Sequence, residues 1–281
     1  MTKTICITTL ALALSGAATA QAASLSDLRP HRAVYDLEMG KSSDRSGITG
    51  MTGRIVYEMT GSACEGFAVR FRFLTNVQTA RKTFTNDQRT TTFEGGDGES
   101  FDFVTQSYLN GQLESDVRGK AARTGSGTDV VLSKPDDEEV SLPTALFPSE
   151  HVVKLIEAAQ AGETIVTAGV YDGSDQGDEI VDTTAIIGKE RSIADGAEGE
   201  PEKLIKELAG EKAWPVSVSY FSSTDIGNEG EKLPVYQVSF LMQDDGVSRD
   251  LTMQYEDYAL RGYLQSLEYL EQATCEPKTS N

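Results

Sequence analysis

The chain has 281 residues, with 44 acidic against 25 basic side chains and a net charge of −19 at pH 7. Such an excess of negative charge excludes tight binding to nucleic acid, because the phosphate backbone would be repelled. The length is enough for one large domain or two small ones.

The N-terminal segment has the features of a secretory signal. Lys3 supplies a positive charge, residues 5–14 form an apolar run, and small residues follow at ATAQA. We expect residues 1–22 to be cleaved and residues 23–281 to be exported. The apolar run is shorter than the roughly 20 residues of a membrane-spanning helix, and no later segment is longer, so we expect no membrane span.

Two cysteines remain after this cleavage, Cys64 and Cys275, because Cys6 leaves with the signal. An even number of cysteines in an exported chain favours a disulfide. Two buried free thiols are an alternative, whereas a zinc site is disfavoured because no histidine lies at ligand spacing. A disulfide would close most of the chain into one loop and stabilise it by on the order of 5 kcal/mol in the chain-entropy model.

The first half of the exported chain alternates between apolar and polar residues. In GFAVRFRFL, apolar residues occupy every second position from Phe67 to Phe73, which predicts a strand with one buried face. Glycine-rich turns separate the runs, notably EGGDGE (94–99) and TGSGTD (124–129). The predicted strands are 32–37, 54–59, 66–74, 82–85, 90–93, 100–106, 113–118 and 129–132.

One helix is predicted in LFPSEHVVKLIEAAQAG (146–162). Pro148 suits the first helical position, Glu150 places negative charge in the first turn, and Gly162 ends the helix. The apolar stripe consists of Val152, Leu155, Ile156 and Ala159. We expect this stripe to cover a sheet or to plug the mouth of a barrel.

Strands resume after the helix. They are predicted at 164–171, 179–187, 216–221, 235–242 and 249–255. Between them, residues 189–213 are charged and irregular, with a short helix at 201–209, and we interpret them as a surface excursion. The segment RGYLQSLEYL (261–270) fits either a helix or a strand.

These elements predict an all-β protein with a single domain over residues 23–281. More than about ten strands in one antiparallel sheet tend to curl, which also limits exposed edges. We therefore expect a large curled sheet or open barrel that encloses, or packs on, one main α-helix.

The sequence contains few candidate catalytic or cofactor-binding residues. The two histidines are His31, near the exported N-terminus, and His151, which we expect to be a partly exposed residue of the helix. No G-x-S-x-G motif is present, and TGSGTD resembles a nucleophile turn only superficially. Trp214-Pro215 and Tyr220-Phe221 are interpreted as packing residues. The sequence predicts no catalytic residue and no cofactor-binding motif.

An acidic turn spans residues 172–182. Its members are Asp172, Asp175, Asp178, Glu179 and Asp182. Compared with the twelve-residue calcium loop, Gly177 falls at position six, but Thr183 stands at position twelve instead of a glutamate. A solvated turn between strands is therefore favoured, with weak cation binding as the alternative, and no metal site is predicted.

Four separated segments resemble one known family. They are PHRAVYDLEM (30–39), LFPSEHVVKLIEAAQAGE (146–163), VYDGSDQGDE (170–179) and LRGYLQSLEYL (260–270). In order and spacing they resemble the EipB-type cell envelope integrity proteins of the Gram-negative periplasm, over residues 30–275.

The resemblance carries several expectations. It implies a β-spiral, an antiparallel sheet wound around a helix and similar in outline to periplasmic lipoprotein carriers, with residues 261–270 as a strand. It implies a disulfide between an early hairpin and the C-terminal end, at the positions of Cys64 and Cys275. A periplasmic tetratricopeptide-repeat protein is a type of partner that it suggests, and it implies no catalytic residues.

Three functions remain open at this point. The first is a non-enzymatic periplasmic protein that supports envelope integrity through protein–protein interaction. The second is a carrier of lipid or lipoprotein acyl chains, with an apolar cavity inside the sheet. The least favoured is a hydrolase of envelope polymers that would use carboxylates such as Asp102, Asp116 and Glu179.

Overall fold

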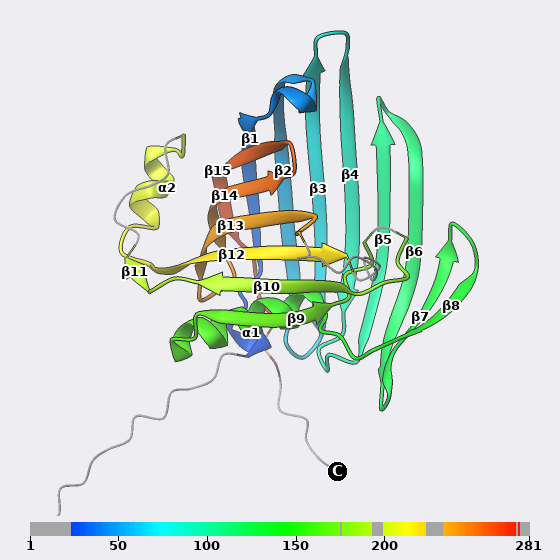
Figure 1. The fold of residues 1–281 in the computed structure, drawn as a ribbon. Helices are drawn as coiled ribbons and strands as arrows, with labels where there is room; N and C mark the ends of the chain where they lie inside the picture. Colours follow the sequence, from blue (N-terminus) through cyan, green and yellow to red (C-terminus); the bar gives the residue numbers. More distant parts are fainter. Residues whose placement is uncertain (1–23, 175, 193–198, 223–232, 274, 276–281) are drawn as a thin grey trace, which may run out of the picture.

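Figure 1 shows one large antiparallel sheet that curls around a helix. The computed structural model describes residues 24–174, 176–192, 199–222, 233–273 and 275. The predicted signal at 1–22 and Asp175 of the acidic turn lie outside the described residues. Within them, no helix combines the length and apolar character needed to cross a membrane.

The sheet has the strand order β8-β7-β6-β5-β4-β3-β2-β1-β15-β14-β13-β12-β10-β9, with β11 paired to β12. The all-β class and the curled antiparallel sheet are confirmed. The fifteen strands of the described residues are β1 His31–Ser42, β2 Ile48–Ser62, β3 Gly66–Thr79, β4 Thr83–Glu94, β5 Ser100–Leu109, β6 Gln112–Thr124, β7 Gly127–Lys134, β8 Glu138–Leu142, β9 Ile165–Val170, β10 Val181–Ile187, β11 Arg191–Ser192, β12 Lys212–Ser222, β13 Tyr236–Gln243, β14 Ser248–Tyr255 and β15 Tyr258–Tyr269.

The sheet consists of two limbs that meet at one seam. β1 to β8 follow each other in sequence order and form the first limb, while β9 to β15 form the second. The seam is the antiparallel pair of β1 and β15, which runs from His31 opposite Tyr269 to Ser42 opposite Tyr258. Segments from the two ends of the chain therefore lie side by side in the middle of the sheet, and β15 is a strand, as the resemblance implied.

Strand β3 shows why the alternation folds in this way. Its apolar residues from Phe67 to Phe73 face the inside of the curl, where they line a cavity. On the opposite face, Arg70 binds Glu58 of β2 at 3.1 Å, and Arg72 binds Asp87 of β4 at 2.8 Å. One face of the strand thus points into the interior, and the other carries cross-strand ion pairs.

Helix α1 (Pro148–Ala161) lies inside the curl (Figure 1). It begins at Pro148, and Gly162 ends it in the left-handed conformation with φ of 76°, as predicted. The buried face of α1 packs into a cluster with Met59 and Phe67 of the first limb and with Val166 and Val218 of the second. The helix therefore occupies part of the space between the two limbs.

The predicted strands differ from the structure most clearly at β4 and β8. β4 is continuous from Thr83 to Glu94, where two short strands are predicted, because the polar residues at its centre pair with neighbouring strands instead of forming a turn. Asp87 among them accepts hydrogen bonds from Arg72 and Arg89. β8 is absent from the prediction because its charged sequence, EEVSL, suits an exposed edge strand better than a buried one.

The charged segment 189–213 is not simply an exposed excursion. Its short helix, α2 (Glu202–Glu207), is close to the predicted range. Leu204 and Leu208 are buried in a cluster with Leu260 and Leu264 of β15. The segment therefore covers part of the apolar interior, and its described charged side chains are exposed except for Glu200, which is buried.

Cys64 and Cys275 form a disulfide, with their Cα atoms 5.7 Å apart. Cys64 lies in the turn between β2 and β3, and Cys275 follows β15. At the entry to this turn Gly61 has a φ of 110°, and a Cβ there would overlap the carbonyl oxygen of Gly66, so only glycine fits. The disulfide thus sits at one end of the seam between the two limbs.

Candidate ligand-binding cavity

A cavity of about 720 Å³ lies between the two limbs of the sheet, beside α1. It is formed by the inward faces of β2 and β3 on one side and of β13 and β14 on the other. This volume falls in the range of known small-molecule sites. Its apolar lining includes Leu28, Ile55, Met59, Phe67, Val69, Phe71, Phe73, Pro148, Val152, Val181, Phe221, Val235, Val238, Leu251 and Met253.

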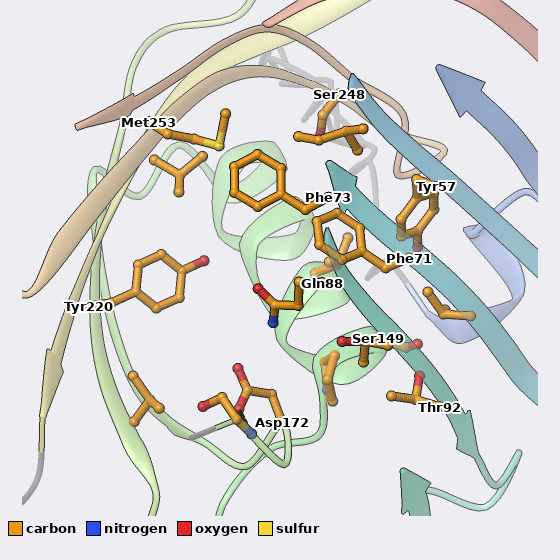
Figure 2. Close-up of a pocket in the computed structure, with 18 of the residues that line it drawn as sticks. Tyr57, Phe71, Phe73, Gln88, Thr92, Ser149, Asp172, Tyr220, Ser248 and Met253 are labelled. Atoms are coloured by element: carbon orange, nitrogen blue, oxygen red, sulfur yellow. Dashed lines mark hydrogen bonds between the residues drawn. The ribbon is translucent and has the colours of Figure 1, made fainter. Parts of the chain in front are cut away.

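The cavity is amphipathic from one end to the other. In Figure 2, Phe73 and Met253 lie toward one end, Asp172 and Thr92 lie toward the other, and Gln88 stands between them. The polar lining comes from β4, β5, the loop after β9 and the end of β12. It includes Gln88, Thr90, Thr92, Glu94, Thr105, Asp172, Ser174, Glu179 and Ser222.

A row of stacked tyrosines borders the cavity on the second limb. The ring centroids are 4.4 Å apart for Tyr220 and Tyr236, and 6.1 Å apart for Tyr236 and Tyr255. Tyr258 extends the row at 4.7 Å from Tyr255. Burial raises the pKa of Tyr220 and of Tyr255 to about 12, so these phenols stay uncharged at neutral pH. The stacked rings therefore give the cavity an uncharged aromatic wall on the second limb.

Glu94, at the end of β4, binds the first turn of α1. Its carboxylate accepts hydrogen bonds from the backbone N–H groups of Ser149 at 2.8 Å and of Glu150 at 3.3 Å, which have no partner within the helix. Burial raises the pKa of the Glu94 carboxyl to about 7. The sequence contains no signal for this contact, because 55 residues separate Glu94 from Ser149.

A second ion pair supports the same turn of α1. Arg123 of β6 donates to Glu150 at 2.6 and 3.0 Å, and Glu150 also accepts from the N–H of Phe147 at 3.0 Å. The N-terminus of α1 is therefore fixed to the first limb at both Glu94 and Arg123.

Both histidines are buried, and the prediction that His151 is partly exposed is wrong. His31 lines the cavity, and its Nδ1 lies 2.7 Å from the carbonyl oxygen of Arg29. His151 faces β10, where its Nε2 lies 3.3 Å from the hydroxyl of Thr183. Burial lowers the pKa of His31, and it lowers the pKa of His151 to about 4. Among the described residues, neither ring has a carboxylate or thiol as a hydrogen-bond partner.

Glu94 and His151 should give stability opposite dependences on pH. Between pH 4.5 and 7, folded Glu94 holds a proton that the unfolded chain releases, so its contribution falls as pH rises. Between pH 4 and 6.5, unfolded His151 holds a proton that the folded chain excludes, so its contribution grows as pH rises. Each effect is on the order of 1–3 kcal/mol.

Urea unfolding from pH 4.5 to 6.5 measures the two effects separately. Glu94→Gln should make the free energy of unfolding rise more steeply with pH than in the wild type, because the His151 contribution is then unopposed. His151→Gln should make it rise less steeply or fall. Slopes that stay at the wild-type value in both variants would contradict this assignment.

The carboxylates proposed for a hydrolase do not gather. Asp102 pairs with Lys120 at 3.4 Å, and Asp116 pairs with Arg118 at 2.8 Å. Glu179 alone of the three lines the cavity, where the hydroxyl of Ser222 donates to it at 3.5 Å. Paired acid and base carboxylates are therefore not assembled from these residues.

A local hydrogen bond holds the described part of the acidic turn. The Asp172 carboxylate accepts from the N–H of Ser174 at 2.9 Å, which closes the turn. Over the part of the chain that the structure describes, no three His, Cys, Asp or Glu side chains come close enough to hold a metal ion. Of the aromatic residues interpreted as packing, Trp214 is buried in the core and Tyr220 packs against the same cluster. Tyr220 and Phe221 also line the cavity.

A curled antiparallel sheet that bends around a helix and a cavity defines a β-barrel-like protein. The chain belongs to the EipB-like family, whose model matches residues 22–271. It is 39% identical to the cell envelope integrity protein EipB of Brucella abortus over 256 residues, which covers 90% of this chain and 88% of that protein.

A solved structure agrees with this assignment. It is a crystal structure of a β-barrel-like protein from Brucella abortus that consists of a domain of unknown function. The two superpose with a TM-score of 0.80 at 37% identity, over 87% of this chain and 99% of that one.

Proposed function

We propose that this protein supports the integrity of the cell envelope by holding an acyl chain of a lipid or lipoprotein in its cavity, without catalysing a reaction. The envelope role rests on the name of the Brucella abortus relative. The acyl ligand rests on one observation, the apolar cavity of about 720 Å³. Export to the periplasm rests on the predicted signal at residues 1–22.

The free energy gained by burying apolar groups favours a long aliphatic ligand. Burial of each methylene group contributes about 0.8 kcal/mol, so a chain of about ten methylenes offsets a large cost of association. The phenylalanines of β3 and the residues Val238 and Met253 supply apolar walls on both limbs. Polar groups at the opposite end leave room for a head group.

Filling the cavity should abolish binding. Val238→Trp places a large side chain in the space, because Val238 is half-buried on β13 and lines the cavity. We expect the fluorescence increase of N-phenyl-1-naphthylamine, an uncharged apolar probe, to fall at least tenfold at a fixed protein concentration. The matched control is Val131→Trp on β7, at a side chain that is 52% exposed, which should bind like the wild type. Equal probe binding in both variants would refute the proposal.

Interaction with another envelope protein is a second candidate, and a tetratricopeptide-repeat protein is the partner that the resemblance suggests. A specific observation favours it. Ile165 of the edge strand β9 and Ile186 of β10 lie opposite each other in the pairing, and they are 63% and 59% exposed. Two neighbouring exposed isoleucines at the edge of the sheet offer an apolar contact for a partner.

Complementation separates the two candidates. Cells that lack this protein would receive Val238→Trp, or Ile165→Thr with Ile186→Thr, and would then be challenged with detergent. The acyl-binding proposal predicts that the edge variant restores resistance and the cavity variant does not. The reverse result would favour the interaction role.

A further inference from the structure

The inward face of β4 carries uncharged polar side chains beside the apolar side chains of β3. In the pairing of the two strands Gln88 lies opposite Phe73 and Thr90 lies opposite Phe71, and all four line the cavity. Thr92 continues the polar row, in which successive members are about 7 Å apart. A ligand that packs on the phenylalanines of β3 therefore has hydrogen-bonding groups along one side.

Gln88 stands where the apolar and polar parts of the cavity meet. In Figure 2 it lies between Phe73, toward the apolar end, and Thr92, toward the polar end. Its side chain is half-buried on β4, and no residue in the described parts of the chain forms a hydrogen bond with its carboxamide. A carboxamide has two N–H donors and an acceptor oxygen. Those of Gln88 are available to a group that enters the cavity.

We infer that Gln88 donates a hydrogen bond to the carbonyl oxygen through which an acyl chain is linked to its head group, so that the cavity prefers esters and amides to alkyl ethers. This inference rests on the proposed acyl-binding function and names the linkage that the same site selects. The chain extends from Gln88 toward Phe73 and Met253, and the head group extends toward Thr92. With an ether, the N–H groups of Gln88 lose water without gaining a carbonyl oxygen, which costs free energy.

The experiment compares two uncharged competitors, 1-lauroylglycerol and 1-O-dodecylglycerol, which share a head group and a chain length and differ in the carbonyl oxygen. Each would displace bound N-phenyl-1-naphthylamine from the wild-type protein with its disulfide intact, below the micelle concentration. We expect the ester to displace half of the probe at a concentration about fivefold lower than the ether does. Because neither competitor is charged, the carboxylates that line the cavity affect both equally.

Two variants then test Gln88 itself. Gln88→Met replaces the carboxamide by a thioether of similar length that has no N–H donor. The preference for the ester should fall below about twofold, while the ether competes as it does with the wild type. The matched control is Gln112→Met, at the exposed start of β6, which should keep the wild-type preference.

The possible results separate this inference from the proposed function. Equal displacement by ester and ether, or a preference for the ether, would overturn the inference in the wild-type protein alone, so that no variant needs to fold, and would leave binding of an aliphatic chain intact. A preference that survives in Gln88→Met, or that is lost equally in Gln112→Met, would overturn the role of Gln88. Failure of both competitors to displace the probe would overturn acyl binding, and the inference with it.

Discussion

Replacing both Cys64 and Cys275 by serine is expected to lower the free energy of unfolding by on the order of 5 kcal/mol. The disulfide joins residues 211 positions apart. In the chain-entropy model a loop of this length removes much of the freedom of the unfolded chain. A loss of this size would remove a third or more of the stability of a typical domain.

The position of the disulfide gives a structural reason for the expected loss of stability. β15 is a central strand between β1 and β14, so the disulfide does not hold a free edge. It closes one end of the seam between β1 and β15, where the two limbs meet. We expect amide exchange in the variant to accelerate first along this seam, at strands β1 and β15.

Thermal melts and urea unfolding measure this effect. Wild-type protein treated with dithiothreitol should match the double serine variant, because both lack the same bond. The melting temperature should fall by roughly 10 °C or more. Equal midpoints for oxidised and reduced wild-type protein would contradict the stabilising role.

Breaking the buried ion pair of Arg249 and Glu200 should cost about 3–5 kcal/mol. The two side chains are 1% and 0% exposed, and they hydrogen-bond to each other. Among the described residues, nothing accepts a hydrogen bond from Nη1 of Arg249. Glu200→Gln would leave a buried cation without its counter-charge, which is the origin of the large cost.

A double-mutant cycle measures the interaction between the two side chains separately from their contacts with neighbouring residues. Arg249→Met with Glu200→Leu replaces both charges by apolar groups and should recover most of the loss. The matched control is Lys206→Met on α2, which breaks an exposed pair with Glu202 and should cost less than about 0.5 kcal/mol. If Glu200→Gln were as mild as this control, the buried pair would not anchor the segment before α2 to the sheet.

The periodic parts of the fold were predictable from sequence. The alternation from Phe67 to Phe73 identified β3, and Pro148 and Gly162 identified the ends of α1, because these signals are local. Segment 261–270 was ambiguous from periodicity alone. It is a strand because β1 and β14 pair with it on both sides, and no local signal reports such neighbours.

The residues that line the cavity could not be predicted from the same signals. Tyr220 and Gln88 face each other across the space in Figure 2 although they belong to different limbs. Whether such residues meet depends on how far the sheet curls. The contact of Glu94 with α1 was missed for the same reason. His151 was expected to be partly exposed because the face of the helix that meets Thr183 depends on β10.

Native mass spectrometry of the protein, purified from its own cells without detergent, tests most directly whether the cavity holds an acyl chain. The account predicts a bound species with the mass of an acyl-bearing lipid or lipopeptide, released on activation and missing from Val238→Trp. A wild-type spectrum that shows the bare chain alone, even after incubation with amphiphiles, would contradict it.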